Sequence, residues 1–532
     1  MAWSGNLGEY MMRKTGVLVG AGLLASCGGG NGSGSGTIVA PPPTPTLAVT
    51  LTPSATTQTV TDTGTTGFSV DATYTGTTSD PVLPELTYDT SLLTLDGTPT
   101  LTGNRYSARF KTVAGLSATR TATSTVRLRL CKETPCATAY PGSDQSFTYT
   151  LNIELADWAM LQRNAGHTGY VNATFDAAAT QPAWTWSVGG TSFTQPVAAR
   201  KGQIFVTRTN PDGSRSVHAI NSANGAEAWS YYIGNIHSAG GPTLIGDQLA
   251  LASMSTSSGD NPLIVLNATT GRYVRDMRFA SQWSDFAQLT AVGDNVYLAS
   301  GYYGNVVYGF DVTTGAANWQ ATGSAGRVWD GSTPAADDRY VYYYSGALDV
   351  FDRATGTKAM SIPDPFWQWN GYSYRGGPML GSTGHVIAYS GSGGGTYALS
   401  LPLVDYDTAG AKVRWRSAGL YSTIPAVARG VVYAGSNTLN RFDAISEEDG
   451  TVRWSWTPPA GERFIGNVIV SNGCVFLSTD RSIYAVNLTG GHETLWKGGR
   501  GGMIAITPDA KLVVTSDFMS EGVYGVTAYT LK

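Results

Sequence analysis

The sequence predicts an all-β protein whose larger part, residues 157–532, is an eight-bladed β-propeller. In this part, two strands joined by a turn that ends in Gly recur with a period of roughly 40–45 residues, which is typical of propeller blades. The phrase reads HAINSANGAEAW (218–229), LIVLNATTGRYVR (263–275), YGFDVTTGAANW (308–319), DVFDRATGTKAM (349–360), VDYDTAGAKVRW (404–415), AISEEDGTVRW (444–454) and YAVNLTGGHETLW (484–496).

A second series of strands counts the blades independently. Strands entered through a turn begin at residues 202, 246, 293, 338, 384, 429, 472 and 509, which indicates eight units. The last unit stops after VYGVTAYTL (523–531) and lacks an outer strand. Because an open array would leave sheet edges exposed, we expect PAWTWSV (182–188) to supply that strand and close the ring.

The residues of the repeat have distinct physical roles. Asn or Asp at the head of the turn accepts backbone N–H bonds, and the final Gly provides a positive φ at low cost. The Trp that follows, as at Trp229 and Trp319, is expected to fill the gap between neighbouring blades. Arg275 and Met360 occupy that place in two units, so the repeat is degenerate.

The turn phrase, the Trp after it and the opening DWAMLQRNAGHTGY (157–170) resemble the pyrroloquinoline-quinone-type (PQQ-like) propeller family. The resemblance implies the fold over about 375 residues but not one activity, since the family contains quinoprotein dehydrogenases and also non-enzymatic envelope lipoproteins such as BamB. Its dehydrogenases use a calcium or lanthanide ion, a catalytic Asp, a stacking Trp and often a vicinal disulfide. This chain has no adjacent cysteines and no C-x-x-C-H haem motif.

The N-terminus predicts export and lipid anchoring. Residues 1–27 read as a lipoprotein signal peptide, in which basic residues after Met11 precede an apolar stretch and the lipobox-like LASC ends at Cys27. The alternative is an ordinary signal peptide that contains a cysteine. Residues 28–46 form a Gly/Ser/Pro tether. Met11 or Met12 is a possible true start. Gly28, instead of Asp, favours the outer membrane by family analogy.

Residues 47–155 predict an immunoglobulin-like β-sandwich. Six segments alternate apolar and polar residues with turn signals between them, and their number and length suit this fold. We interpret the domain as a spacer, with an adhesion module as the alternative.

The remaining cysteines indicate structural roles. Cys131 and Cys136 lie in CKETPC, and an oxidising compartment favours a disulfide between them. A metal site is the alternative, but it needs further Cys or His nearby in sequence, which are absent. Cys474, within GCVFL, is expected to be a buried thiol.

Composition and motifs argue against nucleic acid and against catalysis. The net charge is −4 without a basic run, so nucleic acid is not an expected partner. The five histidines show no metal spacing, and His167 and His218 are expected to be structural. Asp285, Asp330 and Asp364 lie in predicted loops without grouping into a site. We therefore predict no catalytic residue, no metal and no cofactor.

Aromatic residues concentrate in the predicted connections between blades, and such groups are enriched at recognition surfaces. The alternative is that they plug the channel or pack between blades. The candidate binding rim comprises Trp283, Arg327, Trp329, Trp367, Trp369, Tyr372, Tyr374 and Arg375.

Together these features predict a non-enzymatic, lipid-anchored protein of the bacterial envelope that binds envelope proteins through its propeller. The first alternative is a periplasmic oxidoreductase that uses PQQ with calcium. The second is a surface lipoprotein that binds glycan or peptide through the rim.

The lipobox generates the first prediction. Cys27→Ser should move the protein from the membrane fraction to the soluble fraction, because the thiol that would carry the lipid is removed. Immunoblotting of fractionated cells measures this. A variant that stays in the membrane pellet after a high-salt wash contradicts lipid anchoring at Cys27.

Overall fold

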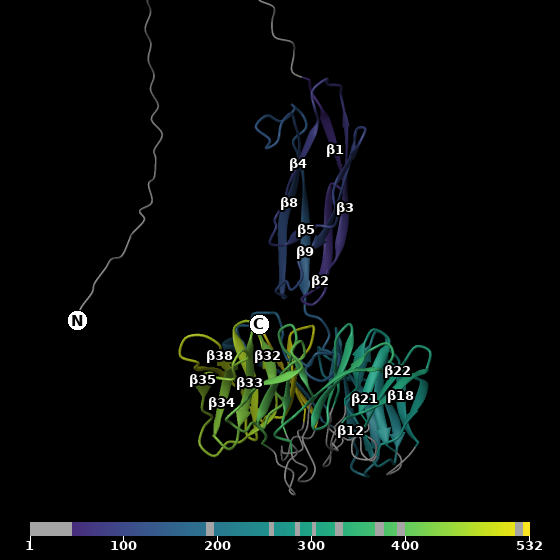
Figure 1. Ribbon diagram of the computed structural model, residues 1–532, viewed down its shortest axis with the longest axis vertical. Coiled ribbons are helices and arrows are strands. Elements are labelled where there is room, and N and C mark those ends of the chain that lie inside the picture. Colours follow the sequence, from purple (N-terminus) through teal and green to yellow (C-terminus); the bar gives the residue numbers. More distant parts are fainter. Residues whose placement is uncertain are drawn as a thin grey trace, which may run out of the picture. The chain divides into compact units, whose positions relative to one another are not determined.

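The computed structural model describes residues 45–532 except 188–195, 255–259, 282–287, 300–304, 325–332, 368–376, 391–399 and 516–524. Within these residues the only helix is one short 3-10 turn, η1 (Ala177–Ala179), and the remaining elements are strands. No described helix has the length and apolar character needed to span a membrane. Because the described elements are almost all strands, the predicted all-β class is confirmed (Figure 1). Residues Thr46–Lys532 form one compact unit.

The N-terminal part of this unit is a sandwich of two sheets. Strands such as β7 and β9 bury every second residue, which is the alternation that the sequence shows. The sheets have the orders β1-β3-β7-β5, with β6 beside β7, and β2-β9-β8-β4, an order consistent with an immunoglobulin-like fold; membership of that family remains a prediction. The strands are β1 (Ala48–Thr52), β2 (Ala55–Thr61), β3 (Gly67–Thr75), β4 (Leu83–Thr87), β5 (Leu93–Leu95), β6 (Thr100–Thr102), β7 (Arg105–Thr112), β8 (Arg120–Cys131) and β9 (Gln145–Glu154).

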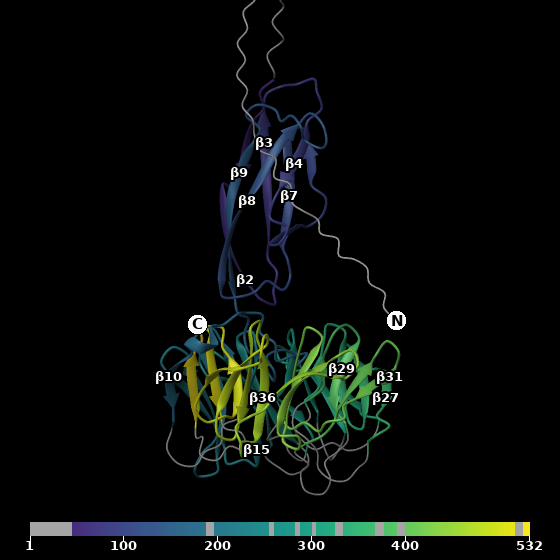
Figure 2. The same ribbon diagram turned by 90° about the vertical axis from the view of Figure 1, so that its left-hand side faces the viewer.

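The rest of the described chain forms eight sheets, each with a path of four antiparallel strands, arranged as propeller blades (Figures 1 and 2). From the inside outward, blades 1 to 4 are β11 (Ala198–Arg200), β12 (Gln203–Thr209), β13 (Arg215–Asn221), β14 (Glu227–Gly234); β15 (Ser238–Ala239), β16 (Thr243–Ile245), β17 (Gln248–Met254), β18 (Asn261–Asn267), β19 (Tyr273–Phe279); β20 (Thr290–Val292), β21 (Asn295–Ala299), β22 (Val306–Asp311), β23 (Ala317–Thr322); β24 (Ala335–Ala336), β25 (Tyr340–Tyr344), β26 (Ala347–Asp352), β27 (Lys358–Pro363). Blades 5 to 8 are β28 (Met379–Leu380), β29 (His385–Tyr389), β30 (Leu403–Asp407), β31 (Lys412–Arg416); β32 (Ala426–Ala428), β33 (Val431–Ser436), β34 (Arg441–Ser446), β35 (Val452–Trp456); β36 (Phe464–Val470), β37 (Cys474–Thr479), β38 (Ile483–Asn487), β39 (Thr494–Lys497); β40 (Met503–Ile506), β41 (Lys511–Thr515), β42 (Val526–Thr530), β10 (Gln181–Trp186).

Burial explains why the middle strands of each blade read as continuous apolar runs. Strands β12 and β17 are buried at nearly every residue, because each lies between two neighbouring blades. The outer strands β14 and β23 alternate between exposed and half-buried residues instead. Each blade therefore contains both a continuous apolar run, in its middle strands, and an alternating pattern, in its outer strand.

Strand β10 closes the ring as predicted. It pairs antiparallel with β42, from Gln181 opposite Thr530 to Trp186 opposite Val526, and Figure 2 shows β10 beside the yellow C-terminal strands. The backbone N–H of Asp176 also donates to the carbonyl of Lys532 at 2.6 Å. Both ends of the propeller are thereby held in one blade.

At four blade junctions, a Trp of the outer strand joins one blade to the next. Trp319 of blade 3 donates its indole N–H to the carbonyl of Arg353 in blade 4 at 3.0 Å, and its ring covers Gly356, where an added Cβ would lie 2.6 Å from the ring. Gly356 also has φ +70°, so both the positive φ and the Trp319 ring disfavour a side chain at this position. Trp184, Trp229 and Trp415 make the same contact with the next blade, and Arg275 lies over Gly315 in place of a ring.

The segment 157–171, which we call the channel segment, forms hydrogen bonds with the innermost strands of blades 1 to 7 and reaches blade 8 through Asn467. Backbone bonds join it to blades 1, 2, 4, 5, 6 and 7, for example Leu244 N–H to Ala159 at 2.8 Å and Val427 N–H to Thr168 at 2.8 Å. Blade 3 is reached through His167 and Thr290. Blade 8 is reached through Asn467, which donates to both Gln162 and Ile504.

His167 has the structural role that the sequence predicts. It is buried, its Nδ1 lies 2.9 Å from the carbonyl oxygen of Pro378, and its Nε2 lies 3.0 Å from Oγ1 of Thr290. Burial lowers the pKa of His167 from 6.5 to about 4. The ring therefore stays neutral at neutral pH and links blades 3 and 5 through the channel segment.

Ring closure generates a second prediction. Deleting residues 523–532 removes β42 and leaves the edges of both β41 and β10 unpaired. We expect the truncated protein to aggregate or to be degraded, because exposed edges pair with other chains. Limited proteolysis and a thermal melt measure this, and a soluble truncation with a cooperative melt would refute closure.

His167 generates a third prediction. Since the folded pKa of about 4 lies below the unfolded value of 6.5, the unfolded chain binds more protons between these values. The free energy of unfolding should therefore fall as pH drops from 6.5 to 4, by up to about 3 kcal/mol from this group. In His167→Asn, where Asn tolerates the φ of +54°, that acid-dependent loss should disappear. Urea titrations at several pH values measure it, with exposed His237→Asn as the control; an unchanged pH slope in His167→Asn contradicts the prediction.

Candidate functional site

Because the strands of each blade alternate in direction, their connections fall on two faces of the propeller. The repeat turns join the third and fourth strands of each blade and lie on one face. The connections between second and third strands, and those between blades, lie on the other, which we call the connection face. Of the candidate rim, Trp283, Arg327, Trp329, Trp369, Tyr372, Tyr374 and Arg375 lie outside the described residues.

Trp367 is the one rim residue within the described part of the chain. Its side chain is half-buried and packs on Gly346, where an added Cβ would lie 2.8 Å from the ring. Its backbone N–H donates to the carbonyl of Asp364 at 3.2 Å. Trp367 therefore packs against its own blade, between β25 and β26.

Three exposed apolar side chains lie on the connection face, in blades 4 to 6. Phe366 follows β27, Leu420 follows β31, and Leu439 lies between β33 and β34; they are 49%, 37% and 44% exposed. The guanidinium of Arg416 lies 4.8 Å from the centre of the Phe366 ring. We call these four residues the apolar patch.

Local contacts hold the apolar patch in place across blades 4 to 6. Ser417, next to Arg416, donates its hydroxyl to the carbonyl of Gly419 at 2.8 Å. The carbonyl of Leu420 accepts from the hydroxyl of Thr438 at 3.2 Å, which places Leu420 beside the turn of Leu439. The backbone under the patch is therefore fixed, and a partner would meet a preformed surface.

The electrostatics of this region favour an acidic or neutral partner. Arg441, at the start of β34, is neutralised by Asp443, whose side chain is fully buried; their charged atoms are 2.9 Å apart. The guanidinium of Arg416 instead makes a cation–π contact with the Phe366 ring. An aromatic–arginine pair flanked by leucines is a composition found at protein interfaces.

Sequence reasoning missed Leu420 and Leu439, although single leucines in the polar loops SAGLYST and SNTLNR were a visible signal.

Polar clusters inside the blades are structural. Nδ1–H of His218 donates to Oε2 of Glu227 at 2.9 Å, and its Nε2 lies 2.7 Å from the hydroxyl oxygen of Ser216. Ser216 and His218 are buried, and the Trp186 ring packs against the imidazole. His218 therefore has the structural role that was predicted.

Burial is the main reason that the pKa of Asp405 rises to about 6 beside His385.

Among the described residues, groups that could serve a quinone–calcium centre are engaged by hydrogen bonds within the protein. The channel segment forms hydrogen bonds with backbone groups of the innermost strands, as shown above. Asp364 is buried and accepts from Tyr344 at 2.7 Å and Ser390 at 2.6 Å, so its carboxylate is already used. Asp285 and Asp330 lie outside the described residues. In the part of the propeller that the structure describes, no three acidic, His or Cys side chains come close enough together to hold an ion.

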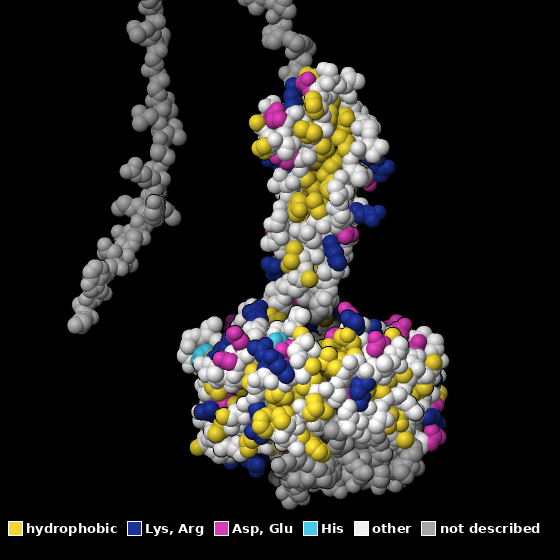
Figure 3. All heavy atoms as spheres, in the orientation of Figure 1, with side chains coloured by type: hydrophobic (Ala, Val, Ile, Leu, Met, Phe, Trp, Pro, Cys, Tyr) yellow, Lys and Arg dark blue, Asp and Glu magenta, His cyan; other side chains and the backbone are white. Residues whose placement is uncertain are grey.

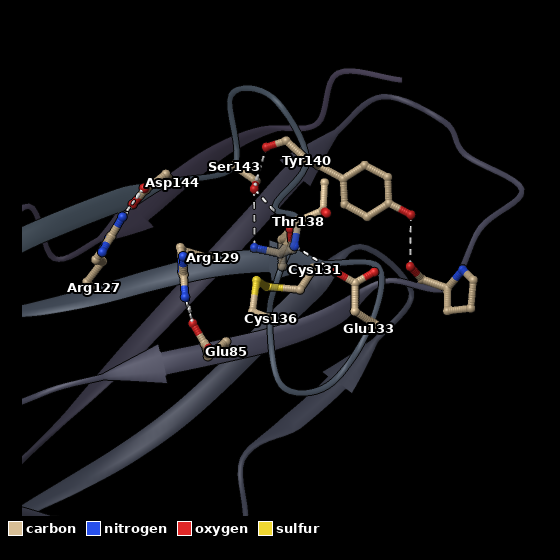
Figure 4. Close-up of a disulfide and its surroundings, with 12 residues drawn as sticks. Glu85, Arg127, Arg129, Cys131, Glu133, Cys136, Thr138, Tyr140, Ser143 and Asp144 are labelled. Carbon is tan, nitrogen blue, oxygen red and sulfur yellow. Dashed lines mark hydrogen bonds and ion pairs between the residues drawn. A yellow bond between two sulfur atoms is a disulfide. The ribbon is translucent and has the colours of Figure 1, made fainter. Parts of the chain in front are cut away.

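The cysteines occupy separate environments. Cys131, at the end of β8, is joined to Cys136 by a disulfide, with Cα atoms 5.4 Å apart (Figure 4). Cys474 is buried in β37, and burial raises the pKa of its thiol to about 11. Cys27 lies outside the described residues.

Comparison with known proteins identifies the family. The sequence matches the family described as outer membrane protein assembly factor BamB over residues 167–286, 213–455 and 366–529, which together span more than half of the chain. The chain therefore belongs to the BamB family of PQQ-like β-propellers. No curated protein matches its sequence.

Solved structures with a similar chain path include three propellers. BamB from Moraxella catarrhalis is 17% identical with a TM-score of 0.45, covering 66% of this chain and 98% of that one. The WD40 propeller domain of Doa1 is 11% identical with a TM-score of 0.38, covering 66% and 97%. The quinohemoprotein alcohol dehydrogenase of Comamonas testosteroni is 14% identical with a TM-score of 0.39, covering 70% and 80%.

Proposed function

We propose that this protein is a non-enzymatic scaffold of the bacterial envelope that binds an envelope protein through the connection face of its propeller. Lipid attached at Cys27 would hold it at the outer membrane. The exposed apolar patch of Phe366, Arg416, Leu420 and Leu439 carries the proposal. Membership of a family named for outer membrane protein assembly supports the envelope location.

The interior of the propeller supports binding over catalysis. In many β-propellers the central channel is the place available for a ligand. Here the channel segment occupies hydrogen-bonding groups of the innermost strands, and the buried carboxylates Asp364, Asp405 and Asp443 are each engaged by neighbouring side chains. Binding at the surface depends instead on exposed side chains, which these interior hydrogen bonds do not involve.

The apolar patch offers a moderate binding energy. Covering a large apolar side chain fully stabilises a complex by about 1.5–3 kcal/mol, and these side chains start half-covered. Each leucine should therefore contribute about 1 kcal/mol. Such a surface suits a partner with its own apolar residues, bordered by carboxylates that approach Arg416.

Position-dependent crosslinking in intact cells tests the proposal. A photo-reactive amino acid at Leu420 or Leu439 should capture one discrete envelope protein, whereas the same group at Val452, which is 42% exposed on outer strand β35, should not. Equal capture at the three positions, or none at the patch, overturns the assignment of this face.

Substitution measures the strength of the same contact. Leu420→Asp with Leu439→Asp should cost about 2 kcal/mol of binding, which is roughly a thirtyfold loss of affinity for the captured protein. The thermal melt should stay nearly constant because both side chains are exposed. Val452→Asp is the matched control.

Two further measurements test the alternative functions. Dye reduction that depends on added PQQ and calcium would favour the oxidoreductase, and retention on a glycan array would favour the glycan-binding alternative.

A further inference from the structure

We propose that the sandwich carries a redox-dependent site for Zn²⁺, formed by Glu85, Cys131 and Cys136 when the disulfide is reduced. This inference is independent of the scaffold role. One ligand atom from each of the three residues lies within 4.8 Å of the others. The sequence shows only the two cysteines, and the fold adds the carboxylate.

Strand pairing brings Glu85 to the cysteines. Strand β4 runs antiparallel to β8, with Leu83 opposite Cys131 and Glu85 opposite Arg129. Figure 4 shows Glu85 and Arg129 beside the disulfide. Cys131 is buried, whereas Glu85 and Cys136 are partly exposed, so an ion can reach the site from solvent.

Arg129 orients the carboxylate for a ligand. Its Nε and Nη2 both donate to Oε2 of Glu85, the former at 2.9 Å. This arrangement leaves Oε1 for the ion, and hydrogen-bonded carboxylates of this kind are common metal ligands. Two thiolates, one carboxylate and one guanidinium also give a formal charge that balances Zn²⁺.

We expect the loop to keep its shape without the disulfide, because hydrogen bonds also hold it. Tyr140 donates its backbone N–H to the carbonyl of Leu130 at 2.9 Å and its hydroxyl to the carbonyl of Pro81 at 2.8 Å. The backbone N–H of Thr138 donates to Glu133 at 2.6 Å. These bonds, several of which Figure 4 draws, keep the two sulfur atoms near Glu85 after reduction.

The chemistry balances with a dithiol as reductant. The dithiol transfers two electrons and two protons to the S–S bond, becomes a disulfide itself, and leaves two thiols on the protein. Zn²⁺ then displaces the two thiol protons and binds both sulfurs and Oε1 of Glu85. Thiolate and carboxylate are established zinc ligands, and water completes a four-coordinate site. The oxidised form cannot supply the thiolates, so the site exists only under reducing conditions.

Cobalt spectroscopy of the full chain carrying Cys27→Ser tests the proposal. After reduction and removal of the reductant without air, one equivalent of Co²⁺ should produce thiolate charge-transfer and tetrahedral d–d bands that Zn²⁺ then abolishes. The oxidised protein and the Cys131→Ser/Cys136→Ser variant should give neither. Absence of these bands in the reduced protein overturns the site.

Glu85 is tested separately from the thiols. Glu85→Gln should weaken Zn²⁺ binding at least about tenfold while leaving the thiols titratable. Asp144→Asn is the matched control, because Asp144 is also paired with an arginine of β8, Arg127, but lies outside the ligand group, and this variant should bind Zn²⁺ like the parent. Equal affinity of Glu85→Gln and the parent overturns the assignment of the carboxylate.

Discussion

The propeller depends on how the inner edges of its blades are satisfied. Eight innermost strands present backbone N–H groups toward the channel, and an unpaired buried N–H costs free energy comparable to a lost hydrogen bond. The channel segment meets this need with its own carbonyls, as at Ala165 for Ala336 and Gly166 for Leu380. Its positive φ values at Gln162, Arg163 and His167 show a chain bent to follow a ring instead of a strand.

The same segment also joins the sandwich to the propeller. Arg163 forms two hydrogen bonds to Asp62, at 2.8 and 2.7 Å, and both side chains are buried. Asp62 further accepts from the backbone N–H groups of Ala156 and Asn172. A buried pair of this kind is strongly destabilising when one partner is removed, by about 3–5 kcal/mol. The spacer interpretation of the sandwich therefore needs an addition, since a specific contact couples it to the propeller.

Among the described residues, interior polar groups form structural hydrogen bonds, and the groups that we propose for function lie at the surface. The apolar patch on the connection face and the cysteine loop of the sandwich use different chemistry, one non-polar and one based on sulfur. Figure 3 shows charged side chains of both signs interspersed over the visible face of the propeller. Such a surface does not steer one kind of charged ligand by a broad field, so short-range contacts must provide specificity.

The sequence by itself determined the features that repeat or are local. Asn or Asp, Gly and Trp at fixed spacing predicted the turns, the count of blades and the closing strand at 182–188, because each depends on contacts within one blade or with the next. The disulfide partners Cys131 and Cys136 were also close in sequence. Only the tertiary structure decided that Asp62 meets Arg163, that Glu85 lies beside the two cysteines, and that Phe366, Leu420 and Leu439 share one surface. These contacts join residues that are far apart in the chain and occur once, so no period or spacing in the sequence marks them.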